Sequence, residues 1–374
     1  MEPTEIVIPP ELRPADGRFA SGPSKVRPEA LAALLETGGS YMGTSHRQAP
    51  VRDVVGRLRA GLRDLFSLPD GYEVVLGTGG STAFWDAAVF GLIEDRSEHL
   101  VFGEFSSKFA KAVSMAPHLK DPVIIESEPG THPEAEARDD VDVYALTENE
   151  TSTGVFMPVK RPGPGALTVV DATSSAGATH VDISQADVYY FAPQKVFASD
   201  GGLWIAIMSP DALDRVASLA ASDRYIPPFF NLQTAVDNSR KNQTYNTPGL
   251  ATLFLMVHQL EAVLEHGGLK WAAERSHRNS YLLYSWTERQ PLAEPFVKDE
   301  AMRSPTVGTI DLAAEINAES VSQALRANGI VDTEPYRKLG RNQLRVALYP
   351  AIENGDIELL TRSIDYVIDV LLDS

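Results

Sequence analysis

The sequence predicts an α/β protein with a large domain built on a mostly parallel sheet, followed by a smaller α+β domain. Short apolar runs alternate with longer helical patterns between about residues 50 and 210, which is typical of a parallel sheet with helices on both faces. These runs lack polar alternation, as expected for strands that are buried on both sides. The chain also has 374 residues, which is enough for two domains.

In the large domain, the expected strands are apolar runs rich in β-branched and aromatic residues. They cover residues 73–76, 100–102, 123–125, 143–146, 167–170, 188–191 and 203–207. Residues 81–93 are expected to form a helix after the first strand, because Ala83, Phe84 and Ala87 repeat at helical spacing. Residues 223–248 are polar, rich in asparagine and contain two adjacent prolines, so we expect a long functional loop or arm there.

The C-terminal part combines helical and strand patterns on a smaller scale. Helices are expected over residues 251–266, 269–290, 320–328 and 354–372, and strands over residues 307–312 and 344–348. We therefore expect a large domain at residues 17–260 and a small domain at residues 261–374. About the first 16 residues are expected to pack on the small domain.

Composition and charge exclude several classes of protein. With 33 basic and 51 acidic residues, the formal net charge is −18, which disfavours nucleic acid and anionic membranes as partners. The chain has no cysteine, which excludes disulfides, thiolate metal sites and cysteine nucleophiles. No histidine has a zinc-binding spacing, so no metal is expected. Neither a leader pattern nor about 20 consecutive apolar residues occur, so we expect a cytoplasmic protein.

A glycine-rich turn between the first strand and the next helix is a candidate phosphate site. Residues 77–82 read GTGGST, and the N–H groups at such a helix start bind anions readily. The turn lacks the lysine of a Walker A loop, and Thr82 stands where a dinucleotide fingerprint requires its third glycine. This substitution argues against the alternative of a nucleotide-dependent oxidoreductase. An ordinary turn capped by Ser81 is the other open interpretation.

Asp171 and Lys195 form the second candidate site. Asp171 ends the expected strand 167–170, and Lys195 follows the strand 188–191 outside any run of charge. Side chains just past the carboxyl ends of parallel strands face the ligand crevice. A confined lysine has the lowered pKa that a Schiff base requires, and an upstream aspartate can keep a pyridine nitrogen protonated. Taken alone, Asp171 is better explained as a cap of the following segment, but the pair favours a pyridoxal phosphate enzyme.

Eight short motifs occur in order along the chain. They are Ser21-Gly22-Pro23, Ser45-His46-Arg47, Gly79-Gly80-Ser81-Thr82, Asn149-Glu150-Thr151, Val170-Asp171 followed by Thr173-Ser174-Ser175, Gln194-Lys195, Asn246-Thr247-Pro248, and Leu344-Arg345 before Leu348-Tyr349. With these motifs, nearly the whole chain resembles the phosphoserine aminotransferases of class V, which depend on pyridoxal phosphate, and among them the actinobacterial form. The resemblance implies a homodimer of the aspartate-aminotransferase-like fold, fold type I, with shared active sites.

The resemblance also implies roles toward the cofactor, pyridoxal 5'-phosphate. Lys195 would hold the cofactor aldehyde and shuttle the proton, and Asp171 would pair with the pyridine nitrogen. Phe105 would stack on the ring, at a position where the family often has tryptophan. The other implied contacts are Gly80, Ser81, Thr151, Ser174 or a neighbour, and Gln194, with Asn246 and Thr247 reaching across the dimer.

For the substrate, the resemblance implies that Arg345 takes the α-carboxylate as a bidentate fork. His46 and Arg47 would bind the substrate's phosphate across the dimer interface. A further basic contact is expected from the small domain, with Arg337, Lys338 and Arg341 as its candidates. The implied reaction interconverts 3-phosphohydroxypyruvate plus L-glutamate and O-phospho-L-serine plus 2-oxoglutarate, in L-serine biosynthesis.

Several alternatives stay open at this point. The enzyme could also accept 4-phosphohydroxy-L-threonine, in pyridoxine biosynthesis. Another class V transaminase, such as an alanine/serine–glyoxylate aminotransferase, would need no site for a substrate phosphate. A cysteine desulfurase would need the cysteine that this chain lacks. The large aromatic residues on core-like patterns are expected to be packing residues, and they are Trp85, Tyr189, Tyr190 and Trp204.

Overall fold

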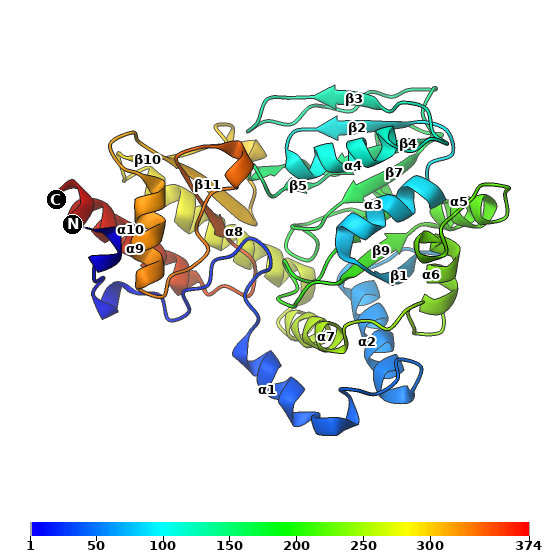
Figure 1. Ribbon diagram of the computed structural model, residues 1–374, viewed down its shortest axis with the longest axis horizontal. Coiled ribbons are helices and arrows are strands. Elements are labelled where there is room, and N and C mark those ends of the chain that lie inside the picture. The colour runs from blue at the N-terminus through cyan, green and yellow to red at the C-terminus, as the bar shows by residue number, and fades with distance from the viewer. Residues whose placement is uncertain (1, 374) are drawn as a thin grey trace.

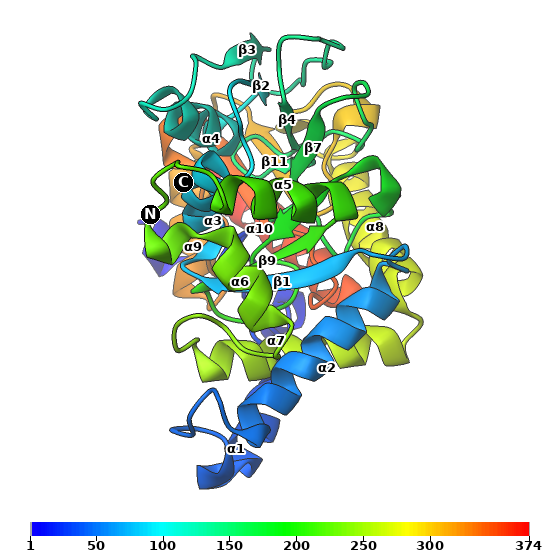
Figure 2. The same cartoon turned by 90° about the vertical axis from the view of Figure 1, so that its right-hand side faces the viewer.

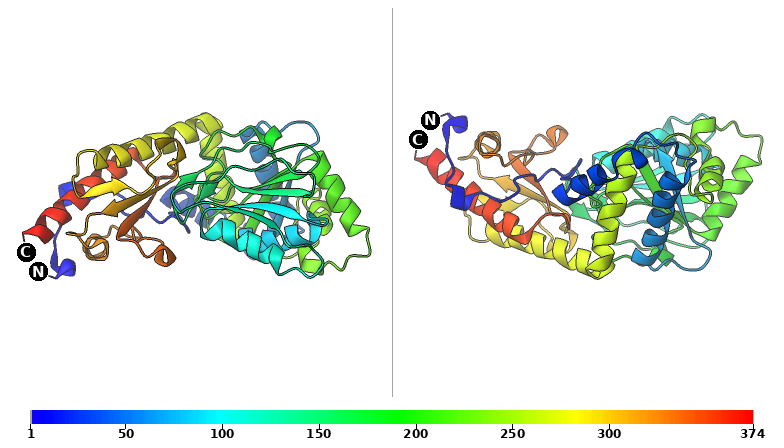
Figure 3. Two further views of the ribbon diagram at one scale, coloured as in Figure 1. Left: turned by 90° about the horizontal axis from the view of Figure 1, so that it is seen from above. Right: turned by 90° about the horizontal axis from the view of Figure 1, so that it is seen from below.

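The computed structural model describes residues 2–373. Two sheets organise the chain, a seven-stranded sheet at one end and a three-stranded sheet at the other (Figure 1). The molecule is elongated along the line that joins the two sheets, and both ends of the described segment 2–373 lie at the end that holds the small sheet (Figure 3). The predicted fold class, a large α/β unit with a smaller α+β unit, is therefore confirmed.

The large sheet has the strand order β1-β9-β8-β7-β4-β2-β3. Its strands are β1 (Glu73–Thr78), β2 (Ser97–Val101), β3 (Val123–Glu126), β4 (Val143–Thr147), β7 (Leu167–Asp171), β8 (Val188–Phe191) and β9 (Leu203–Met208). The strands from β8 to β3 run parallel, whereas β9 is antiparallel to both β8 and β1. Residues 192–202 join β8 to β9 without the crossover helix that a parallel connection requires. A two-stranded ribbon follows β4, formed by β5 (Asn149–Glu150) and β6 (Val155–Phe156).

Helices cover both faces of this sheet (Figures 1 and 2). One face carries α3 (Gly80–Gly91), α4 (Glu104–Ser114), α5 (Pro210–Ala220) and α6 (Leu232–Ser239). The other face carries α2 (Ala49–Leu65) and α7 (Leu250–Glu265), and α1 (Pro28–Glu36) packs against α7. Alternate strand residues enter two separate cores. Val75 packs with the side chains of α3, whereas Val74 and Leu76 pack with those of α2. Because successive side chains of a strand point to opposite sides of the sheet, both faces of the large sheet are buried.

The polar segment 223–248 differs from the expectation of one long loop, which is wrong for its middle part. A 3₁₀ helix, η5 (Pro228–Phe230), and α6 lie within it. The side chain of Asn231 accepts a hydrogen bond from the N–H of Thr234 at 3.2 Å, which caps the first turn of α6. Leu232 and Val236, four residues apart, are both buried on one side of this helix. A single apolar pair on a polar background is a weak sequence signal.

The small unit consists of α8 (Gly268–Thr287), β10 (Ala293–Pro295), β11 (Val307–Leu312), α9 (Ala318–Ala327), β12 (Gln343–Ala347) and α10 (Asn354–Leu372). Its strands pair antiparallel in the order β10-β11-β12. The N-terminal segment lies against α9 and α10. The N–H of Ile8 donates to Asn328 Oδ1 at 3.0 Å, and the N–H of Ala15 donates to Asp356 Oδ1 at 2.9 Å.

The chain crosses between the two units at Gly267, which separates α7 from α8. α7 packs mainly on α2, whereas α8 packs on β11 and α10. We propose the domain division at this glycine, close to the division that was expected after residue 260. No helix within residues 2–373 is long and apolar enough to cross a membrane. The remaining short 3₁₀ helices are η1 (Pro3–Glu5), η2 (Pro10–Leu12), η3 (Gly38–Ser40), η4 (Ile183–Gln185), η6 (Glu300–Met302) and η7 (Arg337–Leu339).

Candidate active site

Lys195 is buried in the loop that follows β8. Its Nζ donates a hydrogen bond to the carbonyl oxygen of Ser21 at 2.7 Å. The same Nζ lies 5.8 Å from the centroid of the Phe105 ring, at the start of α4. Gly22 is packed against the end of the lysine, so that a Cβ there would lie 2.4 Å from Nζ. The amine is therefore confined between the N-terminal segment and the first turn of α4.

This confinement changes the ionisation of the amine. Burial, assisted by the charge of Arg345, lowers the pKa of Lys195 from 10.5 to about 7, against the opposing effect of the Asp171 and Glu150 carboxylates. A large fraction of the amine is consequently neutral near pH 7. The neutral form is the nucleophile that attacks a carbonyl group.

Asp171 ends β7 and is held by donors on both of its oxygens. Thr173 donates to Oδ1 from its N–H at 2.9 Å and from its hydroxyl at 2.5 Å. Oδ2 accepts from the Tyr190 hydroxyl at 3.0 Å and from Trp85 Nε1 at 3.3 Å. Burial raises the pKa of this carboxyl, and these four hydrogen bonds oppose the rise. Trp85 and Tyr190 lie in the buried core, as expected, and their polar ends in addition hold this carboxylate.

The start of α3 lies beside the same loop. Gly79 and Gly80 both have positive φ, and the hydroxyl groups of Ser81 and Thr173 are hydrogen-bonded at 2.7 Å. Ser174 lies elsewhere, because its buried hydroxyl is bonded to Asn149 Nδ2 at 2.7 Å.

The other hydrogen bond received by Ser174 Oγ comes from the Thr151 hydroxyl at 2.8 Å. The hydroxyl of Thr173, and not that of Ser174, therefore faces Ser81. Gln194, which precedes the buried lysine, has a buried side-chain oxygen with no hydrogen-bond partner within residues 2–373.

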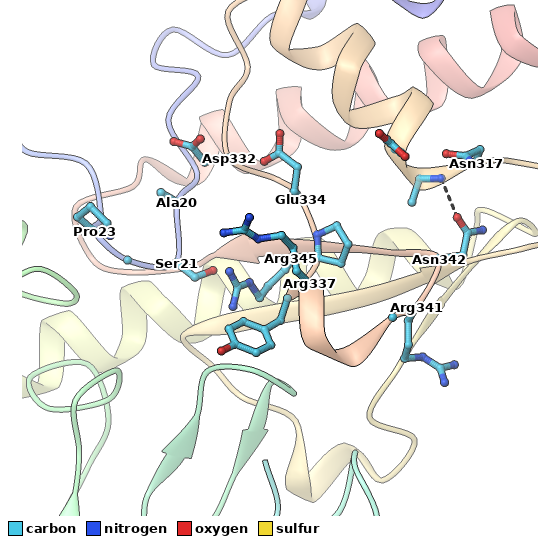
Figure 4. Close-up of a pocket in the computed structure, with 16 residues that line it drawn as sticks. Ala20, Ser21, Pro23, Asn317, Asp332, Glu334, Arg337, Arg341, Asn342 and Arg345 are labelled. Atoms are coloured by element: carbon cyan, nitrogen blue, oxygen red, sulfur yellow. Dashed lines mark hydrogen bonds between the residues drawn. The ribbon is translucent and has the colours of Figure 1, made fainter. Parts of the chain in front are cut away.

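Arg345 on β12 lines a cavity of about 910 Å³ that also exposes Ser21 and Gly22 (Figure 4). Its Nη1 donates to the carbonyl oxygen of Thr151 at 3.3 Å, and its guanidinium lies 5.4 Å from the centroid of the Tyr336 ring. Its buried Nε has no hydrogen-bond partner in the described chain. Arg345 thus keeps free donors for an anion in a largely buried place.

The three basic candidates of the small unit have different partners. Arg341 forms a two-pronged ion pair with Asp311, at 3.1 and 2.5 Å, and Lys338 is paired with Glu104. The exposed guanidinium of Arg337 has no carboxylate partner in the part of the chain that the structure describes. Figure 4 shows it beside Arg345 in the same cavity.

The remaining expected residues gather at a second place. Thr247 Oγ1 lies 3.4 Å from His46 Nδ1, and Arg47 Nη1 donates to Gln243 Oε1 at 3.1 Å. The side chain of Asn246 accepts from the N–H of Thr247 at 2.9 Å. Within residues 2–373, no hydrogen bond joins this group to the buried lysine and aspartate. A single chain thus brings the expected residues together in two groups.

Comparison with known proteins decides the family. Residues 19–333 match the family model "Aminotransferase class-V". A phosphoserine aminotransferase of Nocardioides sp. is 61% identical over 370 residues, which cover 98% of this chain and 99% of the relative. The chain belongs to the phosphoserine aminotransferase family of class V.

Solved structures of class-V and related aminotransferases share the fold. A phosphoserine aminotransferase from Cytophaga hutchinsonii superposes with a TM-score of 0.87 at 23% identity, over 94% of this chain and 99% of that one. An alanine–glyoxylate aminotransferase from Nostoc sp. superposes with a TM-score of 0.80 at 18% identity, over 97% and 98%. The fold is therefore common to phosphoserine and alanine–glyoxylate aminotransferases, and it does not by itself indicate the substrate.

As a class-V aminotransferase the enzyme uses pyridoxal phosphate, and the geometry fits this cofactor. A buried amine of lowered pKa suits the aldehyde, and a buried carboxylate at the next strand end suits the ring nitrogen. The start of α3, with the Ser81 and Thr173 hydroxyls, offers donors to a phosphate. The unpartnered amide of Gln194 adds a further donor when its NH₂ group faces the same place.

Three residues that hold this site together were not expected there from the sequence. They are Trp85, Tyr190 and Glu150. Thr173 falls within the expectation of Ser174 or a neighbour, and a hydroxyl two residues after an aspartate commonly bonds back to that aspartate. The two aromatic residues could not be found in this way, because their apolar patterns conceal which polar group their ends reach.

Proposed function

We propose that the enzyme interconverts 3-phosphohydroxypyruvate plus L-glutamate and O-phospho-L-serine plus 2-oxoglutarate, in L-serine biosynthesis. The observation that carries this proposal is the pair of guanidinium groups in one cavity, Arg345 and Arg337 (Figure 4). A substrate with an α-carboxylate at one end and a phosphate at the other requires two separate cationic groups. The 61% identity to the Nocardioides enzyme supports the same substrate.

Three residues of this chain would have separate roles in the reaction. When bound, pyridoxal phosphate supplies the aldehyde that accepts the amino group and a ring that withdraws electrons. Lys195 Nζ would take the proton from the substrate Cα and deliver it to the carbon that carried the aldehyde, so that the amino group can stay with the cofactor. Asp171, whose charged form is favoured by the donors of Thr173, Tyr190 and Trp85 against the effect of burial, would pair with the protonated ring nitrogen. Arg345 orients the substrate through its carboxylate.

We also propose that the active enzyme is a homodimer. His46, Arg47, Asn246 and Thr247 form one surface group that does not reach the buried lysine of their own chain. Apolar side chains are exposed on the neighbouring elements, namely Leu31, Leu35, Met42 and Tyr245. A second copy that covers this surface would receive Asn246 and Thr247 at the cofactor phosphate, and His46 and Arg47 at the substrate phosphate.

Arg337 is proposed as the small-domain contact of the substrate phosphate, because Arg341 and Lys338 already have carboxylate partners. Replacement of Arg337 by alanine should raise KM for O-phospho-L-serine roughly 10- to 100-fold, the value of one charge-assisted hydrogen bond. The change for glutamate should be smaller, because its distal group carries one negative charge instead of two. Steady-state kinetics with both substrates measure this difference.

Lys338→Ala is the matched control, because it removes an equally exposed cation whose partner Glu104 retains Lys108. It should leave KM for O-phospho-L-serine within about two-fold. Equal losses on both substrates for Arg337→Ala would contradict a phosphate contact. For the wild-type enzyme, faster amino transfer from L-alanine to glyoxylate than from O-phospho-L-serine to 2-oxoglutarate would favour the alanine–glyoxylate alternative instead.

We propose in addition that 4-phosphohydroxy-L-threonine is accepted, which would give the enzyme a part in pyridoxine biosynthesis. The cavity of about 910 Å³ beside Arg345 leaves room for one more carbon than phosphoserine has. The rate with this compound, relative to that with O-phospho-L-serine, tests the proposal. A rate at background would end it without affecting the main reaction.

A further inference from the structure

Glu150 is a fully buried carboxylate to which the proposed mechanism gives no role. It lies in β5 and receives hydrogen bonds on both oxygens. Oε2 accepts from the N–H of Phe105 at 3.1 Å, from the N–H of Ser106 at 2.9 Å and from the Ser106 hydroxyl at 3.0 Å. Oε1 accepts from the Ser152 hydroxyl at 2.7 Å and from the N–H of Ser152 at 3.2 Å.

The backbone donors among these belong to the first turn of α4. The first N–H groups of a helix have no partner within the helix, and a negative charge there is favoured by the helix dipole. The neighbouring N–H groups are also anchored, that of Glu104 to Ser152 Oγ at 3.0 Å and that of Gly103 to Ser106 Oγ at 3.1 Å. Glu150 thus lies at the centre of a cluster that fixes every N–H group of this turn from Gly103 to Ser106.

The backbone is packed tightly against the Glu150 side chain. A Cβ on Gly103 would lie 2.3 Å from Glu150 Cγ and 2.7 Å from Ser152 Oγ. The backbone before α4 therefore approaches the glutamate as closely as a glycine permits. A shift of the carboxylate must move this backbone with it.

Phe105 is the side chain that this turn directs toward the lysine. Its ring centroid lies 5.8 Å from Lys195 Nζ and 5.9 Å from the ring of Tyr336. Its N–H is bonded to Glu150. We propose that Glu150 is a positioning residue, which holds the first turn of α4 so that the Phe105 ring lies over the cofactor. This inference rests on the proposed stacking role of Phe105.

The carboxylate also acts on the lysine through its charge. It is one of two carboxylates that favour the charged form of Lys195, although the net pKa is lowered by burial. A glutamine at position 150 keeps one oxygen for the N–H groups of Phe105 and Ser106, but it turns an NH₂ group toward the donors of Ser152. Glu150→Gln should therefore fold and weaken the anchor, while Glu150→Ala removes it.

The test uses the full-length holoenzyme and a double-mutant cycle between Glu150→Gln and Phe105→Leu. Each single variant should raise the cofactor dissociation rate roughly 2- to 10-fold, the range that one aromatic stacking contact is worth, and should reduce the visible circular dichroism of the bound cofactor. The double variant should resemble Phe105→Leu alone, because the glutamate acts through the ring. Glu148→Gln is the matched control, since this carboxylate is equally buried but bonded to Ser175 and Tyr189.

Additive effects of the two substitutions would overturn the proposal. The proposal would also be overturned if the Glu150→Gln enzyme lost thermal stability but kept the cofactor dissociation rate and the visible circular dichroism of the wild type. The glutamate would then only cap a helix. Phe105→Leu without any effect on these signals would overturn it as well, by removing the ring contact on which it rests. These readouts do not depend on the substrate, so a wild-type enzyme inactive on phosphoserine would refute the proposed function alone.

Discussion

Replacement of Gly22 by alanine should displace the amine of Lys195. The new Cβ would lie 2.4 Å from Nζ and Cε and 2.6 Å from Cδ, whereas ordinary contacts begin near 3.4 Å. The end of the lysine must therefore retreat by about 1 Å, and its hydrogen bond to the Ser21 carbonyl must lengthen or break. A misplacement of that size at a reacting atom can reduce the rate about 100-fold.

The same substitution should also destabilise the fold. Gly22 has φ of 145°, and an alanine in such a conformation costs about 1–3 kcal/mol. Crowding against the lysine adds about 1–3 kcal/mol unless the side chain swings away. The expected loss in the free energy of unfolding is therefore about 1–6 kcal/mol, which a protein of ordinary stability can survive. A swing of the lysine lowers this loss but increases the catalytic defect.

Three measurements on the Gly22→Ala enzyme check this reasoning, namely kcat, the absorbance of the bound cofactor, and urea unfolding. Gly165→Ala is the matched control, because Gly165 also has positive φ (87°) but no atom within 4 Å of its Cβ position. The control should lose stability while keeping kcat and the cofactor band. If Gly22→Ala keeps kcat within two-fold of the wild type, the close approach of Gly22 to the lysine is not needed for catalysis.

Two further changes test the charges at the centre of the site. Between pH 7 and 10 the cofactor-free protein should gain stability as pH rises, because the unfolded amine of Lys195 (pKa 10.5) still binds the proton that the folded amine releases at about 7. The gain in the free energy of unfolding should be on the order of 4 kcal/mol. Urea titrations at several pH values measure it, and Lys195→Met should lack this gain. If the free energy of unfolding rises equally with pH in both proteins, the amine is not buried. Trp85→Phe removes the single N–H that Asp171 and the Tyr190 hydroxyl share, so the enzyme should release its cofactor faster and lose kcat by roughly ten-fold, the value of a hydrogen bond to a charged group. Trp204→Phe, at a tryptophan equally buried but without a bond to that carboxylate, should alter stability only, and similar kinetic losses in both variants would contradict the specific role of Trp85.

Much of the fold could be predicted from local patterns. The strands 188–191 and 307–312 and the helix 354–372 have the bounds that their apolar periodicity indicates. The position of β9 between β1 and β8 could not be predicted, because it depends on pairing between strands more than a hundred residues apart. α6 was missed because Leu232 and Val236 are its only large apolar residues, and their burial depends on contact with the distant α3.

The candidate site shows the same division between local and distant causes. The position of Asp171 and Lys195 at one edge of the sheet could be predicted, because Asp171 ends β7, Lys195 follows β8, and the carboxyl ends of parallel strands meet at one edge. Ser174 or a neighbour was expected near the cofactor phosphate, and the structure turns the Ser174 hydroxyl toward Asn149 and Thr151 while that of Thr173 faces Ser81. The choice between adjacent hydroxyl groups depends on which of them finds a buried partner.

By itself, the sequence determined the fold class, the family and the pair of residues that should hold the cofactor, because these follow from local periodicity and short motifs. Only the tertiary structure decided which of the three cations has no carboxylate partner among residues 2–373. Arg341 and Lys338 are paired with Asp311 and Glu104, and Arg337 is left unpaired in the cavity that Arg345 also lines. The physical reason is that an ion pair forms between groups that folding brings within a few ångströms, regardless of their separation along the chain.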